Sequence, residues 1–558
     1  MIRPCKYLWR CLPIILLLGP VPLAQSGDLS GSDNRYLQIV RTYADNVLQY
    51  GRDVYGPKHT PLFVDGINVD THEPPVWPAR KDYAKIWRMP DQWVLSNLAS
   101  QQNLFRVLTS LTLLTGDPHY KQAAVDATRY GFDHLQHETG LMFWGGHAAW
   151  DAGHEQPVGE ATSREVAGKH ELKHHYPFYE LMWEIDPKAT RKCIEAFWAN
   201  HILRWDILDF NRHGYFEPIP AWIWESQYVG GPVPFTGQGL TFFNAGSDLF
   251  YAAAMLTKFS GDPRPLVWGK RLAKRFVDVR HPETGLGADN FSQYKTHRIQ
   301  KAFEKKFGDR VTEVTITSLY GNRYSLAAIG QMKLYEQLGE PARDFLQWAI
   351  QDLAAYAIHA YDPSDNTFWA TLIDGTRMRP EDGLPRGYVS PRSFRKRSAS
   401  PQHLWAFALA YKLSKDPLMW DMAGQIAAGL GLGRFGTTPA DKPTLDMQTT
   451  CADDKAVLAL LELHQAIGDP SYLALACKVA DNLIQHEFHK GFFVDSPDHL
   501  FAKFNNPAPL ALLYLHAALS DATVELPLYP GSRSYFTCIA EDKGRTNAQG
   551  VIYAKLRK

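Results

Sequence analysis

One short turn motif recurs along this chain and constrains its fold more than any other feature. Each copy joins two apolar segments and combines Gly or Lys with Asp or Glu and then Pro. Gly ends a helix in the left-handed conformation, Asp caps the next helix, and Pro suits its first turn. The copies are Gly116-Asp117-Pro118, Gly261-Asp262-Pro263, Gly339-Glu340-Pro341, Lys415-Asp416-Pro417, Gly468-Asp469-Pro470 and, more loosely, Ile185-Asp186-Pro187. The sequence therefore predicts a string of helical hairpins.

The segments beside these turns carry apolar residues at intervals of three and four, which predicts helices that face a core. Such helices are expected over Asn103–Thr115, Lys121–Leu135, Leu404–Leu413 and Val457–Ile467, whereas the alternation typical of strands is scarce. A chain of 558 residues exceeds one ordinary core, unless a repetitive barrel keeps adding helices around one axis. We predict one all-α domain over residues 27–525, with a tail over 526–558 packed on the same domain.

Residues 1–26 have the pattern of a secretory signal peptide. A basic start precedes an apolar run over Cys11–Leu23 and small residues at Ala24 and Ser26. This pattern predicts a periplasmic or secreted protein, and the run is too short and too rich in proline to span a membrane. Lys plus Arg equals Asp plus Glu, at 59 each. The net charge therefore favours neither nucleic acid nor an anionic membrane as a partner.

Histidines and carboxylates concentrate between Trp144 and Gly214. Within this region His170-Glu171-Leu172-Lys173-His174 matches the H-E-x-x-H pattern of zinc metallopeptidases. In that pattern two His one helical turn apart bind zinc, and Glu is the general base. Pro177 follows closely and disfavours helix before it, so the zinc-binding helix would end almost where it begins. A zinc metallopeptidase is therefore the alternative reading of this region.

A longer series of motifs is shared with a known family. The runs are Tyr50–Lys58, Asp65–Pro74, Ser96–Asn103, Trp144–His147, His170–Lys173, Asn211–Gly214 and Phe243–Leu249. In content and order they resemble the periplasmic pectate lyases, polysaccharide lyase family 2, over nearly the whole mature chain. The resemblance implies an (α/α)7 toroid, which agrees with the hairpins predicted from the turns.

The resemblance also implies a metal site. It assigns His147, Glu171 and His213 as ligands of a divalent transition metal, manganese-like, with cobalt or nickel as alternatives. It assigns Arg212 as the base that removes a proton from the substrate. A guanidinium is normally protonated, so Arg212 acts either as a base of depressed pKa or as an electrostatic stabiliser while hydroxide takes the proton.

The implied reaction is β-elimination of polygalacturonate or oligogalacturonate. A cation on the C6 carboxylate stabilises the enolate charge that develops as the C5 proton leaves. Release of unsaturated disaccharides is one expected outcome, and the choice between exo and endo attack stays open.

Two further residues are candidates for contact with the substrate. Arg323 is suited to clamp a carboxylate bidentately or, alternatively, to form a structural ion pair. Trp224 is a candidate sugar platform, although packing is the commoner role of such a residue. Besides the zinc metallopeptidase, two alternatives are kept. One is a glycoside hydrolase on a similar toroid, which would need paired catalytic carboxylates, and the other is a pectin-binding protein without turnover.

Overall fold

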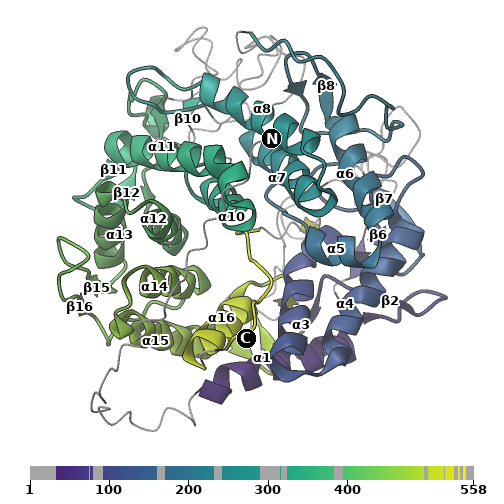
Figure 1. Ribbon diagram of the computed structural model, residues 1–558. Helices are drawn as coiled ribbons and strands as arrows, with labels where there is room; N and C mark the ends of the chain where they lie inside the picture. Colours follow the sequence, from purple (N-terminus) through teal and green to yellow (C-terminus); the bar gives the residue numbers. More distant parts are fainter. Residues whose placement is uncertain are drawn as a thin grey trace, which may run out of the picture.

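The computed structural model describes residues 33–74, 76–78, 92–146, 148–159, 170–231, 242–288, 314–315, 323–382, 394–494, 501–520, 522–532, 538–540 and 545–547. The predicted signal peptide lies outside these ranges, as does His147. The described chain is dominated by helices, which form two concentric rings (Figure 1).

The helices associate in pairs, each with one inner and one outer member. The pairs are α3 (Gln102–Thr115) with α4 (Pro118–Tyr130), α5 (Tyr179–Ile185) with α6 (Pro187–His201), α7 (Phe243–Ser260) with α8 (Arg264–Asp278), α10 (Ala328–Leu338) with α11 (Arg343–Ala360), α12 (Pro401–Ser414) with α13 (Pro417–Gly429), and α14 (Asp454–Ile467) with α15 (Pro470–Glu487). A seventh pair in the described part of the chain joins α16 (Ala508–Leu519) to α1 (Asp33–Tyr50) and closes the ring (Figure 1). The predicted all-α toroid is confirmed.

Inner and outer helices differ in how much of their surface is buried. In the inner helix α12 every residue from Leu404 to Tyr411 is buried, and in α7 every residue from Phe243 to Leu256. The outer helix α8 instead buries one side and leaves Val267 exposed. Burial of one large aliphatic or aromatic side chain stabilises the fold by about 1.5–3 kcal/mol, so the inner ring is the main source of stability.

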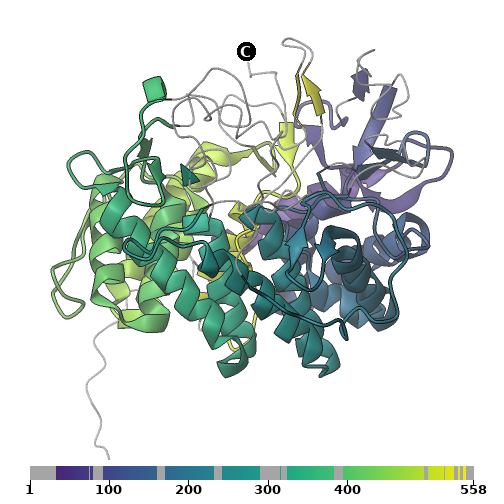
Figure 2. The ribbon, with the colours of Figure 1, turned by 90° about the horizontal axis from the view of Figure 1, so that it is seen from above.

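The six predicted turns link the inner helices to the outer ones. Gly116, Gly261 and Gly468 end their helices with φ between 72° and 83°, and Lys415 adopts the same left-handed conformation. Asp residues then cap the following helix, as Asp117 does by accepting the N–H of His119. The tight turns therefore gather at one opening of the ring, the turn mouth, and the long connections gather at the other, the loop mouth (Figure 2).

The predicted helix boundaries agree with the structure to within a few residues. The exception is the segment predicted over Lys121–Leu135, where α4 ends at Tyr130 and continues as a π-helical turn, η2 (Gly131–Leu135). Further short helical turns are η1 (Leu98–Ser100), η4 (Arg323–Ala327), η5 (Glu340–Ala342) and η6 (Pro380–Asp382).

The long connections carry short strands that the sequence did not reveal. A four-stranded antiparallel sheet has the order β4 (Val76–Pro78), β5 (Gln92–Ser96), β6 (Ala148–Asp151), β7 (Gln156–Gly159). A three-stranded sheet combines β11 (Tyr361–Asp362), β12 (Thr367–Phe368) and β14 (Arg397–Ser398). The two-stranded pairs are β1 (Arg52–Asp53) with β2 (Thr60–Phe63), β3 (Gly66–Asn68) with β19 (Phe501–Lys503), β8 (Ile202–Arg204) with β9 (Asp209–Phe210), β10 (Val314–Thr315) with β13 (Thr371–Leu372), β15 (Gly433–Arg434) with β16 (Thr444–Leu445), β17 (Phe488–His489) with β18 (Phe492–Phe493), and β20 (Cys538–Ala540) with β21 (Arg545–Asn547).

The chain beyond α16 runs along the axis of the ring, and residues 522–532 are called the axial segment here (Figure 1). The Leu528 carbonyl accepts the Nε–H of Arg106 from α3, and the Ser532 hydroxyl donates to Asn103 of the same helix. Tyr529 stacks on Trp405 of α12, with ring centroids 5.5 Å apart. The axial segment therefore fills the middle of the toroid with backbone and aromatic side chains.

Candidate functional site

Three stretches of chain from different connections lie side by side at the loop mouth, and they are called the site segments here. They are Trp144–Gly146, His170–Glu171 and Asn211–Gly214. Gly145 forms a parallel bridge with Glu171, and the Gly146 N–H donates to the Glu171 carbonyl at 2.8 Å. His170 and Gly214 exchange two backbone hydrogen bonds of 2.9 Å. The motifs that carried the family resemblance thus meet in space.

The glycines of these motifs allow the site segments to approach so closely. Gly145 has φ 101°, and a Cβ there would collide with the Glu171 carbonyl oxygen. A Cβ at Gly214 would lie 2.6 Å from the imidazole ring of His201. A side chain at Gly145 would push the first two site segments apart, and a side chain at Gly214 would displace the ring of His201.

Two other motif residues position the first site segment. The Asn97 side chain both donates to the Gly145 carbonyl at 2.8 Å and accepts the Gly145 N–H at 2.9 Å. Asn97 is held in turn by Asp65, whose carboxylate accepts the Asn97 N–H at 2.8 Å. Sequence reasoning assigned no role to Asn97 or Asp65, because the partners that reveal it are distant in the chain.

Glu171 lies at the centre of the site and is fully buried. Its Oε1 atom is 3.6 Å from His213 Nε2 and 3.4 Å from Arg212 Nε. Its other oxygen, Oε2, is 2.6 Å from the Lys173 ammonium. The structure therefore brings Glu171, Arg212 and His213 together as predicted, while His147 lies outside the described residues.

Lys173 is a member of the site that the sequence analysis did not single out. Burial lowers its pKa to about 7, against the attraction of Glu171 and together with the repulsion of Arg212. The signal was present in the sequence, because residues two apart in an extended segment point to the same side. The H-E-x-x-H reading obscured it by suggesting a helix.

Arg212 is 6% exposed, and its guanidinium lies 5.0 Å from the centre of the Phe242 ring. An aromatic face attracts a cation without neutralising it, so this contact orients the guanidinium without fixing its proton. Arg212 and Lys173 therefore place two basic groups around one buried carboxylate.

The zinc-binding helix of the peptidase alternative does not form. His170 lies in a β-bridge, and His174 has a left-handed backbone with φ 53°. Both ring nitrogens of His170 have protein partners, the Trp144 indole at 3.1 Å and His201 Nε2 at 3.0 Å. Within the described ranges, which omit His147, no three His, Cys, Asp or Glu side chains are placed to hold a metal ion.

The turn that follows Glu171 and Lys173 is held by Asp248 of α7. Its buried carboxylate accepts the backbone N–H groups of His174, His175 and Tyr176, the last two at 3.0 and 2.9 Å. Burial raises the pKa of Asp248 to about 7, although the three N–H donors act in the opposite direction. Asp248 thus stabilises a turn in which His174 and Tyr176 both have positive φ.

The two candidates for substrate contact have structural partners. Arg323 is 1% exposed, forms an ion pair of 3.1 Å with Asp352, and donates to the carbonyls of Phe276 and Ala288. Trp224 is 6% exposed and donates through its indole N–H to Glu195. These contacts favour the ion-pair and packing alternatives, and a role in substrate binding stays a prediction for both residues.

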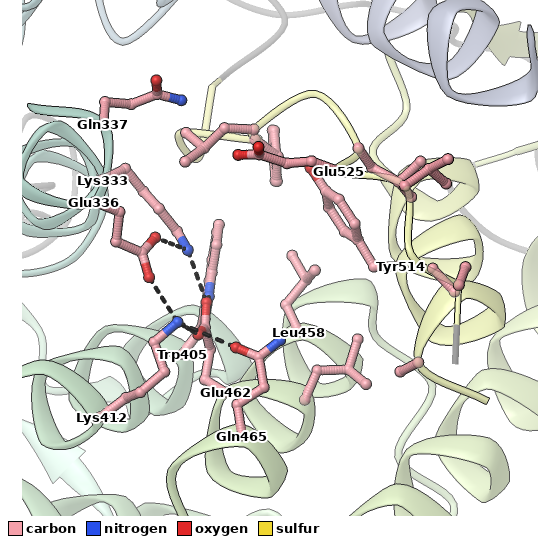
Figure 3. Close-up of a pocket in the computed structure, with 18 of the residues that line it drawn as sticks. Lys333, Glu336, Gln337, Trp405, Lys412, Leu458, Glu462, Gln465, Tyr514 and Glu525 are labelled. Atoms are coloured by element: carbon pink, nitrogen blue, oxygen red, sulfur yellow. Dashed lines mark hydrogen bonds and ion pairs between the residues drawn. The ribbon is translucent and has the colours of Figure 1, made fainter. Parts of the chain in front are cut away.

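A cavity of about 570 Å³ is lined by residues of α10, α12, α14 and α16 (Figure 3). Its polar wall is a closed set of ion pairs in which Lys333 and Lys412 each contact both Glu336 and Glu462. Burial opposes ionisation of Glu462, yet the two lysines hold its pKa below the ordinary value. The cavity contains none of the predicted site residues.

Comparison with known proteins identifies the family. The profile described as periplasmic pectate lyase matches residues 60–538. The pectate disaccharide-lyase of Dickeya dadantii (strain 3937) is 29% identical over 525 residues, which cover 88% of this chain and 91% of the relative.

Solved structures also resemble the chain. A cellobiose 2-epimerase from Spirochaeta thermophila has 14% identity and a TM-score of 0.42, and covers 88% of this chain and 99% of its own. A family 76 glycoside hydrolase from a bovine Bacteroides thetaiotaomicron strain has 14% identity and a TM-score of 0.41, with 87% and 78% covered. Both TM-scores are below 0.5.

Of the helices described, none has the length and apolar character needed to cross a bilayer. The matched profile and the pectate disaccharide-lyase relative show that the chain belongs to the periplasmic pectate lyase family and is a polysaccharide lyase.

Proposed function

We propose that this protein cleaves polygalacturonate by metal-assisted β-elimination at the site segments. The observation that carries the proposal is the position of Glu171 Oε1, which lies 3.6 Å from His213 Nε2 and 3.4 Å from Arg212 Nε. One buried carboxylate oxygen thus faces both the imidazole of a predicted metal ligand and the guanidinium of the predicted base.

The described donors fit a divalent transition metal. Two ligands that each bind one ion at about 2.1 Å lie about 3.4 Å apart at the tetrahedral angle, close to the separation of Glu171 and His213. Imidazole and carboxylate together suit such an ion, and Lys173 contacts Oε2 of Glu171, the oxygen other than the one that faces His213. Glu171, His213 and the predicted third ligand His147 would hold the ion, manganese-like, with cobalt or nickel as alternatives.

The metal, when bound, supplies positive charge that stabilises the enolate developing on the substrate's C6 carboxylate. In the proposed step Arg212, as the neutral guanidine, takes the C5 proton, the C4–O bond breaks, and the departing oxygen takes a proton from water, which leaves a 4,5-unsaturated end. Arg212 is buried, and burial disfavours the charged form of its guanidinium. Lys173 forms an ion pair with Glu171, and this ion pair reduces the stabilisation that Glu171 gives to a positive charge on Arg212. Lys173 thereby assists the basic role of Arg212.

The family description and the pattern of residues 1–26 together support export to the periplasm. We propose that residues 1–26 are removed as a signal peptide and that the mature chain meets oligogalacturonate there.

The test is to incubate the purified mature chain with polygalacturonate and follow both ultraviolet absorbance and reducing ends. An elimination produces both signals, a hydrolase produces reducing ends alone, and a binding protein produces neither. Arg212→Ala should abolish both signals. Arg343→Ala should leave them unchanged, because Arg343 pairs with Glu340 at the turn mouth.

A further inference from the structure

A directed chain of hydrogen bonds connects all three site segments through His201, a residue outside every shared motif. The Trp144 indole N–H donates to His170 Nε2 at 3.1 Å. His170 Nδ1 lies 3.0 Å from His201 Nε2, and His201 Nδ1 lies 2.8 Å from the Asn211 carbonyl oxygen. The chain therefore runs from the first site segment through the second to the third.

Its two ends fix the position of every proton along it. An indole nitrogen can only donate, so Nε2 of His170 must accept and its proton must reside on Nδ1. That proton is donated to His201 Nε2, which places the His201 proton on Nδ1. A carbonyl oxygen can only accept, so this last proton is donated to Asn211. Both imidazoles are thus neutral, each in a single tautomer.

His201 connects helix α6 to the second and third site segments. It is the last residue of α6, fully buried, with its ring edge against Phe197 of the same helix at 4.7 Å between centroids. Its ring also occupies the space that a side chain at Gly214 would need. A rigid helix therefore contacts the segment that carries Glu171 and the segment that carries His213.

We propose that His201 is a positioning residue that sets the separation of the Glu171 carboxylate and the His213 imidazole. It acts through its hydrogen bonds with His170 and Asn211. The inference rests on the metal site of the proposed function. Groups that orient metal ligands typically change metal affinity by 10- to 100-fold when they are replaced.

Three substitutions of His201 distinguish its hydrogen bond with His170 from its hydrogen bond with Asn211. His201→Phe keeps the ring volume and removes both hydrogen bonds. His201→Gln retains an acceptor near the Nε2 position, and His201→Asn retains a donor near the Nδ1 position. The control is His464→Phe, because His464 too lies near the end of a helix, here α14 of the inner ring, and contacts a backbone carbonyl, that of Asp469, at the turn mouth.

The experiment measures binding of Mn²⁺ by calorimetry and the melting temperature of each metal-free variant. We expect His201→Phe to bind Mn²⁺ 10- to 100-fold more weakly, with the Gln and Asn variants in between, and His464→Phe to bind like the wild type. If His201→Phe does not fold, the Gln variant carries the comparison. Wild-type affinity in the His201 variants, or an equal loss in His464→Phe, overturns the positioning role alone. Absence of Mn²⁺ binding by the wild type overturns the metal site and, with it, this inference.

Discussion

Replacement of Asp248 by Ala should destabilise the chain and loosen the turn that carries Lys173. The carboxylate accepts three buried backbone N–H groups, and each donor left unpaired costs about 1–3 kcal/mol. The same change removes a carboxylate whose burial raises its pKa to about 7, so part of that loss is offset. We expect a net loss near the lower limit, about 3 kcal/mol, in the free energy of unfolding measured with urea.

The control for this prediction is Asp416→Ala. Asp416 caps α13 by accepting a single N–H, from Leu418, so its removal should cost about 1 kcal/mol. If Asp248→Ala loses no more stability than Asp416→Ala, the three hydrogen bonds do not hold the turn and the reasoning is wrong.

Asp248 also gives the stability a defined dependence on pH. Its folded pKa of about 7 lies above the ordinary 3.8, so the folded chain binds this proton more strongly than the unfolded chain does. The resulting stabilisation is complete below about pH 4 and is lost as the pH rises to about 7, by at most about 4 kcal/mol. Comparison of urea unfolding at pH 5 and pH 8 should show this loss in the wild type, and Asp248→Asn should lack it.

Three further predictions concern the ligands, the metal and a buried ion pair. His174→Ala should keep both metal and activity, whereas His147→Ala or His213→Ala should lose both, as measured by metal analysis and by the absorbance of unsaturated product; an empty site in His174→Ala alone would restore the zinc hydrolase alternative. A chelator should abolish product formation and Mn²⁺ should restore it, and full activity in chelated enzyme would contradict the metal site. Arg323→Ala should cost about 1–3 kcal/mol in unfolding free energy, with KM unchanged at low temperature, because the buried Asp352 loses one of its two ion pairs and keeps the one with Arg280. A raised KM with unchanged stability would instead support a substrate clamp.

The helical scaffold was predictable because its signals are local. A Gly in the left-handed conformation, an Asp cap and a Pro in the first turn are all set by neighbouring residues, and each predicted turn occurs in the structure. The short strands were not predictable, because two to five residues carry too little periodicity to be recognised. Some of them also pair with a strand from a distant connection, as β3 does with β19.

The site was predictable only in part. The resemblance named Glu171, Arg212 and His213, which the structure brings together. Lys173 was missed because the H-E-x-x-H pattern suggested a helix where the chain is extended. His201 is one of the histidines concentrated between Trp144 and Gly214, but no role could be assigned to it, because its partners, His170 and Asn211, come together only when three connections are assembled at the loop mouth.

The axial segment makes the completed fold depend on residues near the C-terminal end of the described chain. The ring closes when α16 reaches α1, and in the described part of the chain the axis is filled by residues that follow α16. Arg106 of α3 donates both to Leu528 of the axial segment and to the Tyr176 carbonyl beside the site. A chain cut before residue 522 would therefore lack the Leu528 contact of Arg106, which supports the turn at Tyr176. Fragments that end before α16 would form an open ring, and fragments that end between α16 and residue 522 would form a ring without its axial segment.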